Sequence, residues 1–160
     1  MKEIAVVWVG RRAPAPWEEI AGEYRERLAR MSRFSEFRLR AAQGRGSDPG
    51  RALAQEASAI AGVLRERDFV VALDERGRQF TSEALADWLG KDHGLTRIVF
   101  VLGSDLGLDR VVLQRARLRL SLSPMTLPHL LARVVLLEQL YRALDIEAGG
   151  AYHRAVPGSS

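Results

Sequence analysis

Cysteine is absent from the 160 residues, and Lys2 and Lys91 are the only lysines among the basic residues. Without cysteine the chain has no disulfide, no thiolate metal site and no cysteine nucleophile. No apolar run approaches the roughly 20 residues needed to span a bilayer, so we expect no membrane association. The N-terminal apolar stretch is interrupted by Glu3 and followed by arginines, which is typical of a first strand rather than a signal peptide. We expect a cytoplasmic protein.

Familiar catalytic and metal-binding motifs are also missing. The three histidines, His93, His129 and His153, lack the spacing of metal ligands, so no metal site is expected. The sequence has no Gly-x-Ser-x-Gly elbow, no Gly-Lys-Ser/Thr phosphate loop and no Gly-x-Gly-x-x-Gly fingerprint. These absences argue against a serine hydrolase, a P-loop nucleoside triphosphatase and a dinucleotide-binding enzyme.

Arginine is the abundant charge, with a formal net charge of +4 and a sequence pI near 10.1. The guanidinium group binds phosphate oxygens bidentately, so an arginine-rich chain suits contact with RNA or DNA. Arginine in place of lysine can equally reflect the base composition of a genome. Charge alone therefore leaves nucleic-acid binding open.

Strand-like and helical segments alternate along the chain. At this length they predict one α/β domain with a mostly parallel sheet flanked by helices. The expected strands are 2–9, 34–40, 69–73, 97–102 and 119–122, and the expected helices are 17–31, 49–64, 81–90, 109–117 and 128–144. We expect loops at Gln43–Gly50, which is rich in glycine, and at Asp74–Phe80, which is polar.

Ligands of open parallel sheets bind at the carboxyl ends of the strands. Three loops leave such ends, after Leu73, Leu102 and Leu122. The second, Gly103-Ser104-Asp105-Leu106-Gly107, is on its own best explained as a structural turn. In the third, Pro124 and Pro128 restrict the backbone of an apolar turn, which would present backbone polar groups beside apolar side chains. That arrangement suits a flat heterocycle such as adenine, but a buried connection explains it equally well.

The last expected helix is apolar over much more than one face. A helix of this kind must be buried on both sides, which predicts a symmetric homodimer. Glu138 and Arg142 have the spacing of an ordinary helix-surface ion pair. After Gly149-Gly150, the residues Tyr152, His153 and Arg154 could stack on a base, move a proton and hold a phosphate, although such a tail can also be unstructured.

Several segments together resemble one family, the small SPOUT methyltransferases of the RlmH (YbeA) type. The resemblance covers essentially the whole chain. It is carried by the N-terminal strand, Val71–Asp74, Phe100–Gly103, Leu122–His129, Arg133-Val134, Leu140–Ala143 and Tyr152–Arg154. The family's usual Gly-Gly and Pro-Glu-Gly are here replaced by Gly103-Ser104-Asp105-Leu106-Gly107, and the chain continues beyond Arg154.

The resemblance implies a single domain over residues 1–154 with a C-terminal trefoil knot, followed by a disordered tail, 155–160. It also implies a homodimer in which the tail of one subunit completes the site of the other. S-adenosylmethionine would bind in the knot, held largely by backbone groups. The positions that match the cofactor site are Leu73, Gly103, Leu122, Ser123, Pro124, Met125, Thr126 and Leu127.

The implied reaction is methylation of N3 of a pseudouridine in 23S ribosomal RNA, on assembled ribosomes. Tyr152, His153 and Arg154 would then bind the target nucleotide, with His129 and Arg133 near the pocket. His153 is our hypothesis for the proton acceptor, because an unperturbed imidazole titrates near pH ~6.5. A SPOUT methyltransferase acting on another RNA and a non-catalytic ribosome-associated protein are the alternatives.

Overall fold

The computed structural model describes residues 1–42, 48–94 and 97–155. Most of the loop predicted at Gln43–Gly50 lies outside these residues. So does the predicted disordered tail, apart from Ala155, which ends a short 3-10 helix, η1 (His153–Ala155). None of the described helices is long and apolar enough to cross a membrane.

Strands and helices alternate as the sequence predicts. The strands are β1 (Glu3–Val9), β2 (Arg33–Leu39), β3 (Phe69–Gln79), β4 (Ile98–Leu102) and β5 (Leu118–Ser121). The helices are α1 (Ala15–Met31), α2 (Pro49–Val63), α3 (Ser82–Gly90), α4 (Arg110–Arg115) and α5 (His129–Glu147). Thr81 caps α3 as expected, with its hydroxyl oxygen accepting from the backbone N–H of Ala84 at 3.0 Å.

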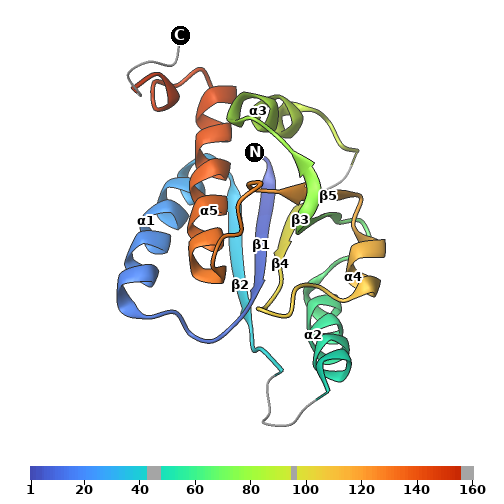
Figure 1. Cartoon of the computed structure of the whole chain (residues 1–160). Coiled ribbons are helices and arrows are strands. Elements are labelled where there is room, and N and C mark those ends of the chain that lie inside the picture. Colours follow the sequence, from blue (N-terminus) through green and yellow to red (C-terminus); the bar gives the residue numbers. More distant parts are fainter. Residues whose placement is uncertain (43–47, 95–96, 156–160) are drawn as a thin grey trace.

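The five strands form one parallel sheet in the order β2-β1-β4-β3-β5. Helices α1, α3 and α5 cover one face, and α2 and α4 cover the other (Figure 1). Strand β1 is buried on both sides, with Ile4 and Val6 in the first core and Ala5 and Val7 in the second. The predicted α/β fold with a parallel sheet is confirmed.

Strand β3 is longer than the sequence predicts. The prediction of a polar loop at Asp74–Phe80 is wrong, because the strand continues to Gln79 and pairs again with β5 after a register shift between Leu73 and Arg78. Gly77 permits this extension, since a Cβ there would lie 2.6 Å from the carbonyl group of Arg119. The charged side chains of this extension are mostly exposed, which is why the segment resembles a loop.

Helix α5 follows the edge strand β5 yet packs between α1 and α3, over the sheet (Figure 1). The turn from Leu122 to Pro128 therefore brings the chain back from the edge of the sheet. This path is consistent with the knot expected for the C-terminal part. It also places the start of α5 at the C-terminal ends of the strands, which we call the carboxyl edge of the sheet, beside the candidate site.

Candidate active site

The loops after β4 and β5 meet the continuation of β3 at the carboxyl edge of the sheet, on the α5 side. The strand register aligns Ala72 with Val101, and Leu73 with Leu120, so the ends of β4 and β5 lie next to the middle of β3. Leu73, Leu122 and Leu127 pack on a small cluster made by Trp8, Ala13, Leu102 and Ala132. Three of the eight positions predicted to bind the cofactor therefore share one apolar cluster.

The turn after β5 is held by its own serines. Ser121 Oγ donates to the carbonyl of Ser123 at 3.0 Å, and Ser123 Oγ accepts from the backbone N–H of Met125 at 2.9 Å. Pro124, Met125 and Thr126 are exposed, whereas Leu122 and Leu127 are half-buried. The backbone N–H groups of Thr126 and Leu127 donate to no residue in the described part of the chain. The turn thus offers unused backbone donors beside apolar side chains.

Gly103 and Gly107 form a tight turn after β4. A Cβ at Gly103 would lie 2.3 Å from the carbonyl oxygen of Gly107, and Gly107 has a φ of +81°. The N–H of Gly107 donates to the carbonyl of Ser104 at 2.8 Å. Both positions therefore require glycine, the first for close backbone approach and the second for its conformation.

Ser104, which departs from the family pattern, reaches the other side of the sheet. Its Oγ donates to Oε1 of Glu56 at 2.6 Å, and both residues are buried. Glu56 Oε2 accepts from the backbone N–H of Ala42 at 3.0 Å. Sequence reasoning missed Glu56, because a glutamate on an amphipathic helix gives no signal that it points inward. Asp105 next to it is exposed.

His129 opens α5 against the backbone of Gly10 and the ring of Trp8. A Cβ at Gly10 would lie 2.7 Å from His129 Nε2, and the two ring centroids are 5.6 Å apart. Within the described chain, neither His129 Nε2 nor Trp8 Nε1 has a hydrogen-bond partner. Burial lowers the pKa of His129, opposed by the carboxylate of Asp105. The lowered pKa favours the neutral form of this imidazole.

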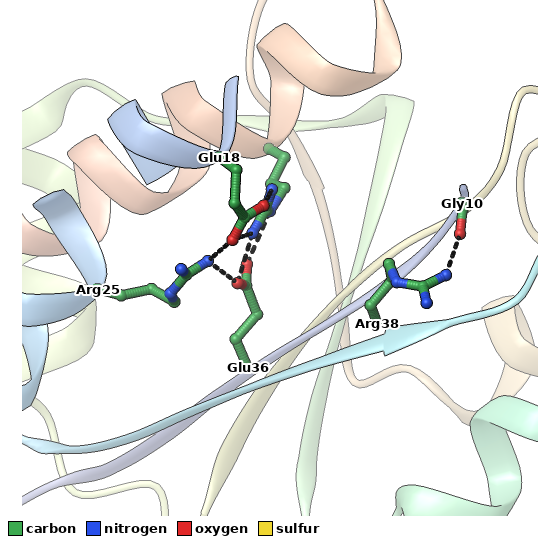
Figure 2. Close-up of polar contacts among 6 residues, drawn as sticks. Gly10, Glu18, Arg25, Glu36 and Arg38 are labelled. Atoms are coloured by element: carbon green, nitrogen blue, oxygen red, sulfur yellow. Dashed lines mark hydrogen bonds and ion pairs between the residues drawn. The ribbon is translucent and has the colours of Figure 1, made fainter. Parts of the chain in front are cut away.

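Arg133 lies one helical turn further along and is turned toward two carboxylates. It donates to Glu36 at 2.6 and 2.9 Å and to Glu18 at 3.0 Å. Arg25 donates to the same two carboxylates (Figure 2). The hydrogen bond from Arg133 lowers the pKa of Glu18. The guanidinium carbon also lies 4.4 Å from the centroid of the Trp8 ring. Arg133 thus borders the site through Trp8 and ties α5 to α1 and β2.

Tyr152, His153 and Arg154 lie at the other end of α5. Tyr152 donates through its hydroxyl to Glu138 at 3.1 Å and stacks edge-on to Tyr141. Arg142 contacts Nδ1 of His153 at 3.0 Å, and Nε2 of His153 lies 2.7 Å from Glu83. Arginine can only donate, so Nδ1 accepts and Nε2 carries the hydrogen. Burial, together with Glu138, raises the pKa of Tyr152. Arg154 is exposed.

In a single chain, the predicted catalytic residues therefore lie at two opposite ends of α5. Helix α5 has 19 residues, or about 28 Å at ~1.5 Å per residue, and it separates His129 from His153. The predicted pair Glu138–Arg142 forms at 2.7 Å, but both side chains are largely buried and hold Tyr152 and His153. It is more than the helix-surface pair that its spacing predicts.

Among the described residues, no group of three histidine, aspartate or glutamate side chains could hold a metal ion. The described residues at this edge supply backbone donors, apolar side chains and the imidazole of His129.

Comparisons with known proteins find similar proteins over nearly the whole chain. A family model described as "Predicted SPOUT methyltransferase" matches residues 1–153. The chain is 44% identical over 156 residues to a protein of Solidesulfovibrio magneticus named ribosomal RNA large subunit methyltransferase H, covering 96% of this chain and 99% of that one. It is 43% identical over 150 residues to the protein of that name from Gloeobacter violaceus, covering 94% and 97%.

Two solved structures share the fold at low sequence identity. A probable methylase family protein from Haemophilus influenzae superposes with a TM-score of 0.55 at 15% identity, covering 99% of this chain and 73% of that chain. A putative methyltransferase from Legionella pneumophila, solved with bound SAM, gives 0.50 at 11% identity, covering 93% and 67%.

Proposed function

The chain belongs to the SPOUT methyltransferase family, and we propose that it methylates N3 of a pseudouridine in the 23S ribosomal RNA of assembled ribosomes. It is a methyltransferase by family. The observation that supports ribosomal RNA as the substrate is the match to relatives named ribosomal RNA large subunit methyltransferase H, which spans nearly the whole length of both chains. S-adenosylmethionine is the proposed methyl donor, with no metal required.

The carboxyl edge of the sheet fits this cofactor. Gly103 allows the tight turn after β4, because a Cβ there would collide with the backbone of Gly107, and this turn would border the cofactor. Thr126 and Leu127 have unused backbone N–H groups that suit the polar edge of adenine. Leu73, Leu122 and Leu127 provide apolar contact for its faces. Ser123, Pro124 and Met125 complete the turn and would hold the cofactor with them.

S-adenosylmethionine, when bound, supplies an electrophilic methyl group. The protein must orient the pseudouridine so that N3 faces that group, and it must receive the N3 proton as the N–C bond forms and the C–S bond breaks. Alignment of the reacting atoms supplies much of the rate, with effective molarities of ~10⁵ M or more in well-oriented systems. We assign base stacking to Tyr152, phosphate contact to Arg154 and proton transfer to His153.

A homodimer brings the two ends of α5 together. One chain holds His129 and His153 at opposite ends of a helix about 28 Å long, by the ~1.5 Å rise of each residue. An antiparallel partner helix would place its tail beside the cofactor turn of the first subunit. The half-buried side chains of Leu131, Val134 and Val135 on α5 would then be covered. His153 must also leave Arg142 and Glu83, because both of its nitrogens are engaged in the single chain.

Purified protein tests this function on ribosomes from a strain that lacks the gene. The expected result is one labelled methyl group per ribosome, mapped by mass spectrometry to a pseudouridine of 23S RNA. His153→Ala should abolish transfer and leave calorimetric binding of S-adenosylmethionine unchanged. The assignment fails if the 23S pseudouridine is already methylated in that strain, or if only transfer RNA accepts the label.

A further inference from the structure

Four arginines lie together beside the candidate site, and none of them pairs with a carboxylate in the described part of the chain. Arg11 and Arg12 follow β1, and Arg38 and Arg40 are at the end of β2, the neighbouring strand. The N–H of Gly10 donates to the carbonyl of Leu39 at 2.9 Å, which holds the two strand ends together. All four side chains are exposed. We call these residues the arginine edge.

The arginine edge borders a groove with a volume of about 850 Å³. Arg12, Arg38, Trp8 and Arg133 are among the residues that line it. Arg133 is already neutralised there by Glu18 and Glu36. Arg25 pairs with the same two carboxylates (Figure 2). Glu19 also lines the groove, so it offsets one of the four remaining cations.

The free cations contrast with the paired ones. In the described part of the chain, Arg11, Arg12 and Arg40 make no side-chain hydrogen bond or ion pair, and Arg38 donates only to the carbonyl of Gly10, at 3.1 Å (Figure 2). Exposed guanidinium groups gathered on one edge match the oxygens of a phosphate backbone.

The arginine edge is continuous with the cofactor turn. Gly10 precedes Arg11, and its backbone lies against His129, the first residue of α5. Leu122 and Leu127 pack on the same cluster as Trp8 and Ala13, which border the groove. A polyanion lying along the arginine edge would therefore reach the carboxyl edge where the methyl donor is proposed to bind.

We propose that the arginine edge binds the phosphate backbone of ribosomal RNA next to the target nucleotide and orients that RNA toward the site. This role rests on the proposed function, which supplies the RNA. It would let a chain with a net charge of only +4 hold a large polyanion, because the unpaired cations are concentrated at one place. Phosphate contacts position a nucleic acid without reading its sequence.

Binding of fluorescent variants to ribosomes from the gene-deletion strain tests the arginine edge. Arg12→Gln with Arg38→Gln removes two contacts at the groove. Arg11→Gln with Arg40→Gln removes two exposed cations whose side chains make no hydrogen bond or ion pair with a described residue, so we expect these variants to fold normally. Arg33→Gln with Arg67→Gln is the matched control, because both arginines are exposed at the amino edge of the sheet.

Each lost phosphate contact lowers the slope of log affinity against log salt by about 0.7–0.9. For two contacts, the affinity ratio of wild type to variant should be about tenfold larger at 50 mM than at 200 mM salt. The control pair should keep the wild-type slope, and all variants should bind S-adenosylmethionine as the wild type does. A photoreactive residue at position 11 should crosslink to RNA.

Unchanged slopes in both edge variants, an equal loss in the control pair, or crosslinks to ribosomal protein alone would overturn the role of the arginine edge. The proposed function would survive each of these if wild-type protein still methylated the ribosomes. If wild type instead bound through the arginine edge but transferred no methyl group to 23S RNA, the methylation assignment would fall and the binding surface would stand.

Discussion

Ser104→Ala should loosen the Gly103–Gly107 turn. The hydroxyl of Ser104 donates to Glu56 at 2.6 Å, and the two residues are 8% and 3% exposed. Hydrogen bonds to charged groups contribute ~1.5–3 kcal/mol, so the free energy of unfolding should fall by about 2 kcal/mol. For a domain of this size that lowers Tm by about 4–8 °C, at a fixed protein concentration because the protein is proposed to be dimeric.

A double-mutant cycle separates this contact from other effects of the substitution. Glu56→Ala alone should cost more than Ser104→Ala, because Glu56 also accepts from the N–H of Ala42. In the Glu56→Ala background, Ser104→Ala should cost about 0.5 kcal/mol or less, giving a coupling of about 2 kcal/mol. Unfolding in urea measures all four proteins.

The affinity for the cofactor should also depend on the hydrogen bond between Ser104 and Glu56. Gly103 borders the proposed cofactor site, and Ser104 anchors it. Ser104→Ala should therefore weaken calorimetric binding of S-adenosylmethionine, whereas Ser58→Ala, an exposed serine on α2, should not. Additive energies in the cycle, with wild-type cofactor affinity for Ser104→Ala, would refute a role for Ser104 in holding the turn.

Three further substitutions test other parts of the site. Burial lowers the pKa of His129 below its usual 6.5, so its contribution to stability is present above pH ~6.5 and is lost as pH falls toward the folded pKa. In His129→Gln, the free energy of unfolding in urea should therefore change less between pH 7 and pH 5 than in the wild type. An unchanged pH profile would contradict this. Arg133→Met leaves the nearly buried Glu36 with only Arg25 and should cost about 3 kcal/mol in urea unfolding, whereas a loss below about 0.5 kcal/mol would mean that the pair is not formed. Tyr152→Phe should keep kcat and KM within a few-fold, while Tyr152→Ala should raise KM for ribosomes ~10-fold or more if the ring stacks on a base; equal kinetics for both would exclude stacking.

The parallel sheet was predictable because its signals are local. Strand β4 is an unbroken apolar run, and the helices carry caps such as Thr81 that can be read within a few residues. Strand β3 was underestimated, since its last residues are charged and extend only by pairing with β5 around Gly77. That pairing joins Arg78 to Leu120, which lies some 40 residues later in the sequence.

The polar contacts of the site were not predictable from the sequence. Glu36 and Arg133 are 97 residues apart, Ser104 and Glu56 are 48 apart, and Glu83 and His153 are 70 apart. No helical or strand period links such positions, so only the packed fold brings them together. The family resemblance supplied the candidate residues, and the structure showed that one chain places them at two ends of α5.

Mixed dimers test the shared site most directly. A tail variant, His153→Ala, is refolded with an equal amount of a turn variant, Leu127→Asp, chosen to lose calorimetric binding of S-adenosylmethionine. If each site uses the turn of one subunit and the tail of the other, half of the randomly formed dimers contain one intact site. Methylation of deletion-strain ribosomes should then recover to about a quarter of the wild-type rate. No recovery in confirmed mixed dimers would contradict the account, because every chain would then need its own turn and its own tail.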